Sequence, residues 1–353
     1  LKNIFRDGDP LHLDTIGEAL LHNNYIYAAG GSLRMKPSTS TGFKNQKLIK
    51  SKLLRLNIAN DEIDEIDIVG DEIDIAGDDD RTFMIHNVID NQLIISSTKI
   101  IATSDNPKEN SADLSIGKYN LESGELKFGF RRTFTKEYKV RSILPFHYIY
   151  SPHNDKHYLI NAKEDNSKNN ILDQNHLMIY VLDGSLKLES ELKIPFKSIP
   201  DKEFKVFIMP RITDNKLQIY VQNTKELTNR KVCTDSPLVQ SYIIDENNNY
   251  IKTDEYHNVR FGKIVGQEHS KYIPVLKLKD MHGKLPCYDT YFSVFDTKKK
   301  KIEDINYHFP LEPGFLPYLA TMRRKHVLFY QNQVEFGIDF SLEARNYSYD
   351  KDL

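Results

Sequence analysis

The sequence predicts an all-β protein, chiefly because one short hairpin pattern recurs six times along the chain. Each copy has an apolar run, a polar turn and a second run rich in β-branched and aromatic residues. The copies are Ala19 to Gly31, Phe83 to Ser97, Tyr148 to Ala162, Val206 to Val221, Ile264 to Leu276 and Leu316 to Tyr330. A long repeat made of strands is typical of the blades of a β-propeller.

A second hairpin follows a variable loop in most repeats. These hairpins are Leu53 to Ile68, Leu114 to Phe130, Leu177 to Phe196, Val239 to Tyr256 and Tyr291 to Phe309. Most of them turn at Asp, Asn, Gly or Lys. Asp, Asn and Gly tolerate the positive φ of tight turns. Two hairpins in each repeat predict a four-stranded blade.

The repeats predict one domain over residues 1–353, a β-propeller of six four-stranded blades. The blades are expected at residues 17–69, 82–134, 146–196, 204–259, 261–310 and 313–345. The sixth repeat lacks one strand, since only Glu335 to Leu342 follows its first hairpin. We expect the N-terminal stretch Ile4 to Leu13 to supply that strand, which would close the ring and remove an exposed sheet edge.

Composition favours a soluble domain with a large core. The 353 residues have 39% hydrophobic content, enough for one large core. The net charge of −2 lacks the positive field that nucleic-acid binding requires, so no nucleic-acid partner is expected. No apolar run approaches the length of a transmembrane helix. The compartment stays open, with the cytoplasm favoured.

The two cysteines fall at matching places in neighbouring repeats. Equivalent positions on adjacent blades are normally too far apart for a disulfide, so Cys233 and Cys287 are expected to be free thiols. Neither has a His or a second Cys at zinc-binding spacing, and no metal or other cofactor is expected.

One strand resembles a known repeat family. The segment Tyr25 to Gly31, with its Gly30-Gly31 pair, is similar to the double-glycine strand of a kelch repeat, and Leu54 to Asn57 stands where that repeat places its third strand. The other repeats lack the Gly pair, and the chain has no Trp, which kelch blades usually carry. The chain thus resembles a divergent kelch-like propeller, and a six-bladed propeller of another lineage fits nearly as well. The resemblance implies a protein-binding platform, with enzymes in the minority.

The loops between second and third strands are predicted to be long and to share one face. They are Ser32 to Lys52, Ser97 to Asp113, Lys163 to His176, Gln222 to Pro237 and Lys277 to Asp289. Long loops on a rigid scaffold are where binding is usually built, although disordered insertions have the same composition. Their basic residues can recognise an acidic protein partner, and the candidate set is Arg34, Lys36, Lys44, Arg230, Lys231, Lys279 and Lys284.

Two further groups of polar residues have a structural and a functional interpretation. The acidic stretch Asp61 to Asp80 fits either a calcium site or a solvated strand edge, and the strand edge is favoured. His22, His86, His153 and His269 lie near the first hairpin turns, where Arg211 and Arg323 occupy the nearby positions of two other repeats. We expect these histidines to be turn residues rather than metal ligands.

No catalytic signature accompanies the repeats, since the chain lacks a G-x-S-x-G elbow, a phosphate-binding glycine loop and H-E-x-x-H. The first hypothesis is therefore a non-enzymatic scaffold that binds a protein through the long-loop face. The alternative is a carbohydrate-binding or carbohydrate-active propeller with a site at the mouth of its central channel. The lack of Trp, a preferred sugar-stacking ring, counts against that alternative.

Overall fold

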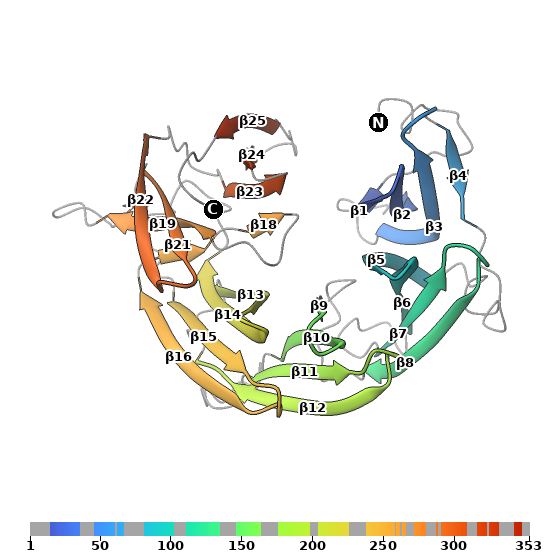
Figure 1. The fold of residues 1–353 in the computed structure, drawn as a ribbon, viewed down its shortest axis with the longest axis horizontal. Helices are drawn as coiled ribbons and strands as arrows, with labels where there is room; N and C mark the ends of the chain where they lie inside the picture. Colours follow the sequence, from blue (N-terminus) through green and yellow to red (C-terminus); the bar gives the residue numbers. More distant parts are fainter. Residues whose placement is uncertain are drawn as a thin grey trace, which may run out of the picture. The chain divides into compact units, whose positions relative to one another are not determined.

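The computed structural model of the chain consists of β-strands and turns, and no helix occurs in the part that it describes (Figure 1). The all-β prediction is confirmed for these residues. Accordingly, nothing in them has the helical length and apolar character needed to cross a bilayer. The structure describes residues 15–35, 46–60, 62–66, 81–101, 111–134, 146–163, 176–197, 204–225, 238–257, 259–261, 263–265, 272–279, 287–288, 291–308, 316–322, 325–331 and 342–347.

The chain divides into two compact units. Unit 1 comprises Leu1–Tyr150, Lys156–Tyr158 and Tyr180–Glu191, and unit 2 comprises Ser151–Asp155, Leu159–Ile179 and Leu192–Leu353. Each unit is described by itself.

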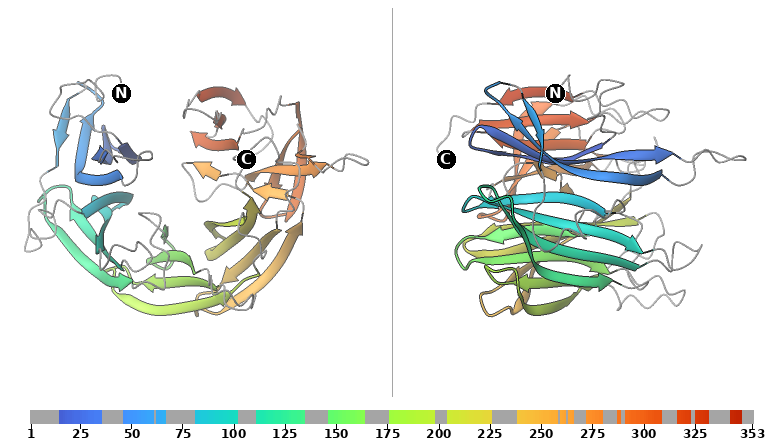
Figure 2. Two further views of the ribbon diagram at one scale, coloured as in Figure 1. Left: turned by 180° about the vertical axis from the view of Figure 1, so that it is seen from behind. Right: turned by 90° about the vertical axis from the view of Figure 1, so that its right-hand side faces the viewer.

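Two sheets of unit 1 follow the predicted blade pattern. The first has the order β1 (Thr15–His22), β2 (Tyr25–Met35), β3 (Gln46–Asn57) and β4 (Ile63–Glu65), and the second has the order β5 (Arg81–Ile89), β6 (Gln92–Ile101), β7 (Ser111–Asn120) and β8 (Leu126–Phe134). Their ladders are antiparallel throughout, and in Figure 2 the strands of the second sheet lie side by side, coloured cyan to green. Two antiparallel hairpins per repeat are therefore confirmed here.

A third sheet has the order β12 (Leu188–Pro195), β11 (His176–Leu182), β10 (Lys156–Lys163) and β9 (His147–Ser151). Its central strand β11 is buried along almost its whole length, with Tyr180 among the fully buried residues. Within unit 1, Tyr180 contacts the rings of Phe130 and Phe134. This third repeat thus also forms the expected four strands.

Unit 2 contains the remaining three sheets. One has the order β13 (Phe204–Thr213), β14 (Lys216–Lys225), β15 (Leu238–Ile244) and β16 (Tyr250–His257). The next has the order β17 (Val259–Phe261), β19 (Tyr272–Lys279), β21 (Tyr291–Asp296) and β22 (Lys301–His308), and the short β20 (Cys287–Tyr288) also pairs with β19. The last has the order β18 (Lys263–Val265), β23 (Leu316–Met322), β24 (Lys325–Gln331) and β25 (Leu342–Tyr347).

Apolar faces of neighbouring sheets pack together inside each unit. In unit 1, Tyr27 and Leu53 of the first sheet share a core with Phe83 and Leu93 of the second. In unit 2, buried Tyr220 packs with Phe261 and Phe295 of the next sheet. Successive side chains of a strand point to opposite sides of the sheet, so alternate residues of each strand lie on these apolar faces.

The first hairpin of several sheets turns at residues with positive φ. Asn23, Asp90, Asn91, Asp214 and Asn215 have φ between 47° and 61°. Asn and Asp tolerate this left-handed conformation better than other residues with a side chain. The polar turns identified in the sequence therefore have the expected backbone.

An Asn or Asp ends or directly follows the third strand of five sheets and holds the next turn. The residues are Asn57, Asn120, Asp183, Asp245 and Asp296, and the Oδ1 atom of each accepts a backbone N–H from two residues further on, at 2.8 to 3.0 Å. This arrangement fixes the second hairpin locally. The recurrence is visible in the sequence, and it marks the repeat more regularly than the Gly30-Gly31 pair does.

The fifth predicted hairpin, Ile264 to Leu276, is wrong. Strand β19 pairs with Val259–Phe261, which lies before that segment, and β18 pairs in parallel with β23 of the following sheet. The physical reason is burial: Val259 and Phe261 are 7% and 3% exposed and fill the core against β19. This short apolar segment belongs to the fifth sheet rather than to the end of the fourth repeat.

Four of the five long loops are shorter than expected, because their strands continue as paired ribbons. β2 and β3 pair as far as Met35 and Gln46, and β6 and β7 pair as far as Ile101 and Ser111. β14 extends to Lys225, and β19 to Lys279. The third loop begins and ends as predicted, between β10 and β11.

The predicted ring closure falls on residues 4–13, which lie outside the described residues. So does most of Glu335 to Leu342; the strand after β24 instead begins at Leu342. The edge of that sheet beside β23 is occupied by β18. The closed propeller and its single domain therefore stay predictions. Cys233 also lies outside the described residues.

Candidate functional site

The seven basic residues predicted to bind a partner are not brought together by the described residues. Arg34 ends β2 opposite Lys47, and Lys279 ends β19 opposite Cys287. Lys36, Lys44, Arg230, Lys231 and Lys284 lie outside the described ranges. The proposed binding arc thus stays a prediction.

Two of the four histidines lie at a turn or a strand end, as expected, whereas His86 lies inside β5. His22 ends β1, and His153 lies in the turn after β9, with its Nε2 atom 3.9 Å from the Glu246 carboxylate. His269 and Arg323 lie outside the described residues. Among the residues that are described, no three His, Cys, Asp or Glu side chains gather at a potential metal site.

The beginning of the acidic stretch forms a strand edge. Asp64 of β4 lies opposite Arg55 of β3, and their side chains form an ion pair at 3.0 Å. The Asp64 hydrogen bond raises the pKa of Arg55. The strand-edge interpretation therefore holds for Ile63–Glu65, while residues 67–80 lie outside the described ranges.

Unit 1 has a group of polar rings on strands β5, β9 and β10, here called the ring cluster: His86, Tyr148, Tyr150 and His157. The His86 ring of β5 stacks on the Tyr148 ring of β9, with centroids 4.8 Å apart and planes inclined by 29°. The Tyr148 hydroxyl hydrogen-bonds the Nδ1 atom of His157 at 2.7 Å, and Tyr150 lies with its ring centroid 4.8 Å from that of His157. The rings thus form one contiguous group.

Local structure explains where these rings lie. The β5–β6 ladder is irregular between Ile85 and Asn87, which leaves His86 outside the regular pairing. The His86 Nε2 atom is 2.8 Å from the buried Ser96 hydroxyl, which holds the ring in place. His157 and Tyr148 are 0% and 8% exposed, whereas His86 and Tyr150 are half-buried. The half-buried His86 ring is thus held by its stack on Tyr148 and by the Ser96 hydroxyl.

Unit 2 has a buried cation on the edge strand β13. Arg211 lies opposite Gln218 of β14 and is 3% exposed. Burial lowers the pKa of Arg211 to about 10, so the guanidinium is still charged at neutral pH. Its Nε and Nη1 atoms are buried and have no hydrogen-bond partner. The sequence singled out Arg211 only as a substitute for a histidine near a turn.

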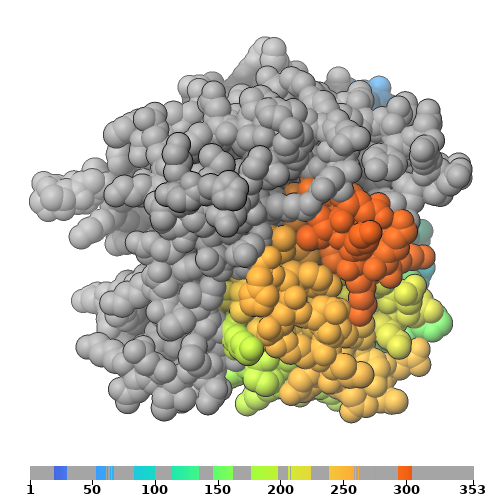
Figure 3. Space-filling view, turned by 90° about the vertical axis from the view of Figure 1, so that its left-hand side faces the viewer, coloured from blue at the N-terminus to red at the C-terminus, as the bar shows by residue number. Residues whose placement is uncertain are grey.

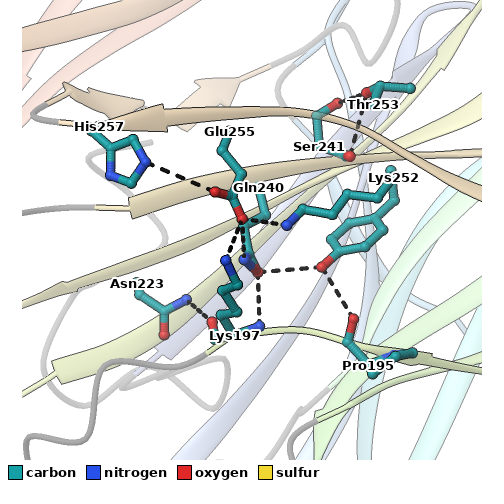
Figure 4. Close-up of polar contacts among 10 residues, drawn as sticks. Pro195, Lys197, Asn223, Gln240, Ser241, Lys252, Thr253, Glu255 and His257 are labelled. Atoms are coloured by element: carbon teal, nitrogen blue, oxygen red, sulfur yellow. Dashed lines mark hydrogen bonds and ion pairs between the residues drawn. The ribbon is translucent and has the colours of Figure 1, made fainter.

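A third polar group, drawn in Figure 4, surrounds Glu255 of β16. Its carboxylate accepts a hydrogen bond from Lys252, lies 3.4 Å from the Lys197 ammonium, and accepts from the Gln240 amide at 3.3 Å. The hydrogen bond from Lys252 and the charge of Lys197 hold the pKa of Glu255 below its usual range. His257 adds a longer ion pair at 3.8 Å.

The groups around Glu255 are mutually satisfied, which indicates a structural role. The buried Gln240 accepts from the backbone N–H of Lys197 at 3.0 Å and from the Tyr242 hydroxyl at 3.2 Å, and Asn223 donates to the Lys197 carbonyl at 3.0 Å. These bonds fasten the segment after β12 to the sheet β13–β16. Buried polar networks that are fully satisfied rigidify a fold.

The outer hairpin of the next sheet is fastened in a similar way. Lys300, in the turn before β22, donates to Asp254 of β16 at 3.0 Å. In Figure 3 this hairpin lies directly against the surface of the β15–β16 strands. The lysine run Lys298 to Lys301 therefore forms a hairpin tip, and Lys300 is paired to the neighbouring sheet.

No family model matches this chain, and no curated protein matches it either. Among solved structures, it is similar to an α-L-arabinofuranosidase from Fusarium graminearum, with 8% identity and a TM-score of 0.46 over 92% of this chain and 89% of that one. It is also similar to prolyl oligopeptidase B from Galerina marginata, with 11% identity and a TM-score of 0.48 over 95% of this chain and 42% of that one. A third is an apocarotenoid oxygenase mutant from Synechocystis, with 11% identity and a TM-score of 0.41 over 80% and 62%. The chain spans less than two thirds of the length of the latter two.

Proposed function

We propose that this protein binds a carbohydrate or a similar polar small molecule at the ring cluster of unit 1, within a six-bladed, kelch-like propeller. One observation carries the proposal: the stack of half-buried His86 on Tyr148, whose hydroxyl is held by His157. Small-molecule sites combine aromatic faces with a few well-placed polar groups. The ring cluster supplies both without Trp.

The test is a titration of mono- and oligosaccharides against the wild-type chain and two variants. His86→Ala removes the half-buried member of the stack, and we expect at least a tenfold loss of affinity, since one ring contact and one hydrogen bond are each worth about 1 kcal/mol. His153→Ala is the matched control, because that side chain is 51% exposed in a turn, and it leaves affinity unchanged. Absence of saccharide binding, or equal loss in both variants, contradicts the proposal.

A second candidate function is the protein-binding scaffold, and the β2–β3 ribbon favours it. The register of this ribbon pairs Arg34 with Lys47, so two basic residues of the predicted binding face stand at neighbouring backbone positions. A partner with acidic side chains would complement basic residues placed in this way.

The scaffold is tested by capturing proteins on the whole chain, before and after residues 36–45 and 226–237 are replaced by tight turns. A partner that is lost on shortening, and weakened by alanine at Arg34, Lys36, Arg230 and Lys231, supports the scaffold. Unchanged binding by all of these variants excludes it.

A further inference from the structure

The guanidinium of Arg211 is buried, and no ion pair joins it to an acidic side chain of the described residues. Arg55 pairs with Asp64, Arg132 pairs with Glu191 at 2.6 Å, and Lys300 pairs with Asp254, all at positions that keep partial exposure. Arg211 is 3% exposed, and its buried Nε and Nη1 atoms meet no acceptor. A buried charge without a partner is strongly destabilising.

A second orphaned donor lies beside it. Tyr220 of β14 is 0% exposed, and its hydroxyl also has no hydrogen-bond partner. Arg211 lies opposite Gln218, two residues from Tyr220 on the same strand, so both side chains are on one face of the sheet. Burial raises the pKa of Tyr220, and the positive charge of Arg211 opposes that rise.

We propose that Arg211 and Tyr220 form a binding site for a small oxyanion, either a carboxylate or a phosphate group. Guanidinium and hydroxyl donors are the groups that such oxygens accept from, and charge-assisted bonds of this type are the strongest in proteins. Arg211 is 3% exposed, so a folded partner cannot reach it, and the ligand we propose is a small ion or the terminal group of a larger molecule. The site lies in unit 2 and is independent of the ring cluster.

The choice of donors also restricts the ligand. Both orphaned groups donate hydrogen bonds, and a protonated guanidinium accepts none. The neighbouring amide of Gln218 is already engaged with the Ser241 hydroxyl at 3.3 Å. A neutral sugar hydroxyl would leave the charge uncompensated, whereas an oxyanion satisfies the charge and the donors together.

The test measures thermal unfolding of the whole chain in inorganic phosphate, acetate or glucuronate, each against chloride at equal ionic strength. We expect at least one oxyanion at 10 mM to raise the wild-type Tm by about 2 °C or more, because ligand that binds only the native state stabilises it. Phosphate alone raising Tm identifies a phosphate site, and the two carboxylates raising it identify a carboxylate site.

Three variants complete the test. Arg211→Met abolishes the rise and, without added oxyanion, is at least as stable as the wild type, since an apolar side chain of similar length replaces an unpaired charge. Tyr220→Phe weakens the apparent affinity several-fold. Arg132→Met removes an arginine that already forms an ion pair with Glu191, and this variant retains the rise in Tm with oxyanion.

Three results overturn the proposal. The first is a wild-type Tm that none of the oxyanions raises. The second is an Arg211→Met variant that responds as the wild type does. The third is an Arg211→Met variant that, in chloride alone, loses as much stability as Arg132→Met, because that loss indicates a guanidinium already satisfied by the protein.

Discussion

Truncation of Gln222 should destabilise unit 2 by far more than truncation of a comparable glutamine. Gln222 of β14 is 2% exposed, and its amide bonds both backbone groups of Phe261: it donates to the carbonyl at 3.2 Å and accepts from the N–H at 2.6 Å. The side-chain amide of Gln222 thus makes the two backbone hydrogen bonds that a neighbouring strand would otherwise make to Phe261. Gln222→Ala leaves two buried backbone groups unpaired, at about 1 to 3 kcal/mol each, so we expect a loss of about 3 kcal/mol.

The matched control is Gln218→Ala, four residues earlier on the same strand and 4% exposed. Its amide makes one bond, to the Ser241 hydroxyl, which keeps its bond from Thr253 at 3.0 Å. We expect a loss of about 1 kcal/mol from Gln218→Ala. Urea unfolding followed by circular dichroism compares the variants, and hydrogen exchange at the Phe261 amide reports the local effect. Equal losses, or unchanged Phe261 protection in Gln222→Ala, would refute the reasoning.

Two further predictions concern unit 1. Gly129→Ala places a Cβ 2.5 Å from the Ser185 carbonyl oxygen and 2.7 Å from the Leu186 Cβ. We therefore expect the free energy of unfolding in urea to fall by about 1 to 3 kcal/mol. Lys127→Ala is the control and changes it little, because the Lys127 side chain is 76% exposed. A silent Gly129→Ala would show that β8 is not packed against that turn. The Ser185 hydroxyl and the Lys187 N–H hold the pKa of Asp183 below its usual range. The native pKa is depressed, so this stabilisation is complete above the unfolded-state pKa and is lost as pH falls through the native one. Asp183→Asn keeps the turn, as Asn57 and Asn120 do, and its stability should fall less steeply below about pH 4. If the stabilities of Asp183→Asn and the wild type fall equally steeply below about pH 4, the Asp183 carboxylate does not contribute in this way.

Much of the candidate site could not be read from the chain. The alternation and turns that predict a hairpin are local, but the partners of His86 and Arg211 are set by register and by packing between strands. His86 was identified only as a turn residue, and its stack on Tyr148 joins strands of two different sheets. The fifth hairpin was misplaced for a related reason: Val259–Phe261 is too short to show a period, and only its burial against β19 assigns it to a sheet.

The amino-acid sequence by itself determined most of the antiparallel hairpins and the polar residues at their turns, because each depends on residues that are close together in the chain. Only the tertiary structure decided which polar side chains are satisfied. Gln240 and Arg211 are both buried polar residues in strands of one sheet, and nothing in their sequence surroundings separates them. Packing gives Gln240 its partners at Lys197 and Tyr242 and leaves the Nε and Nη1 atoms of Arg211 without any. The free energy of a buried polar group depends on whether that partner exists, and the partner comes from distant parts of the chain.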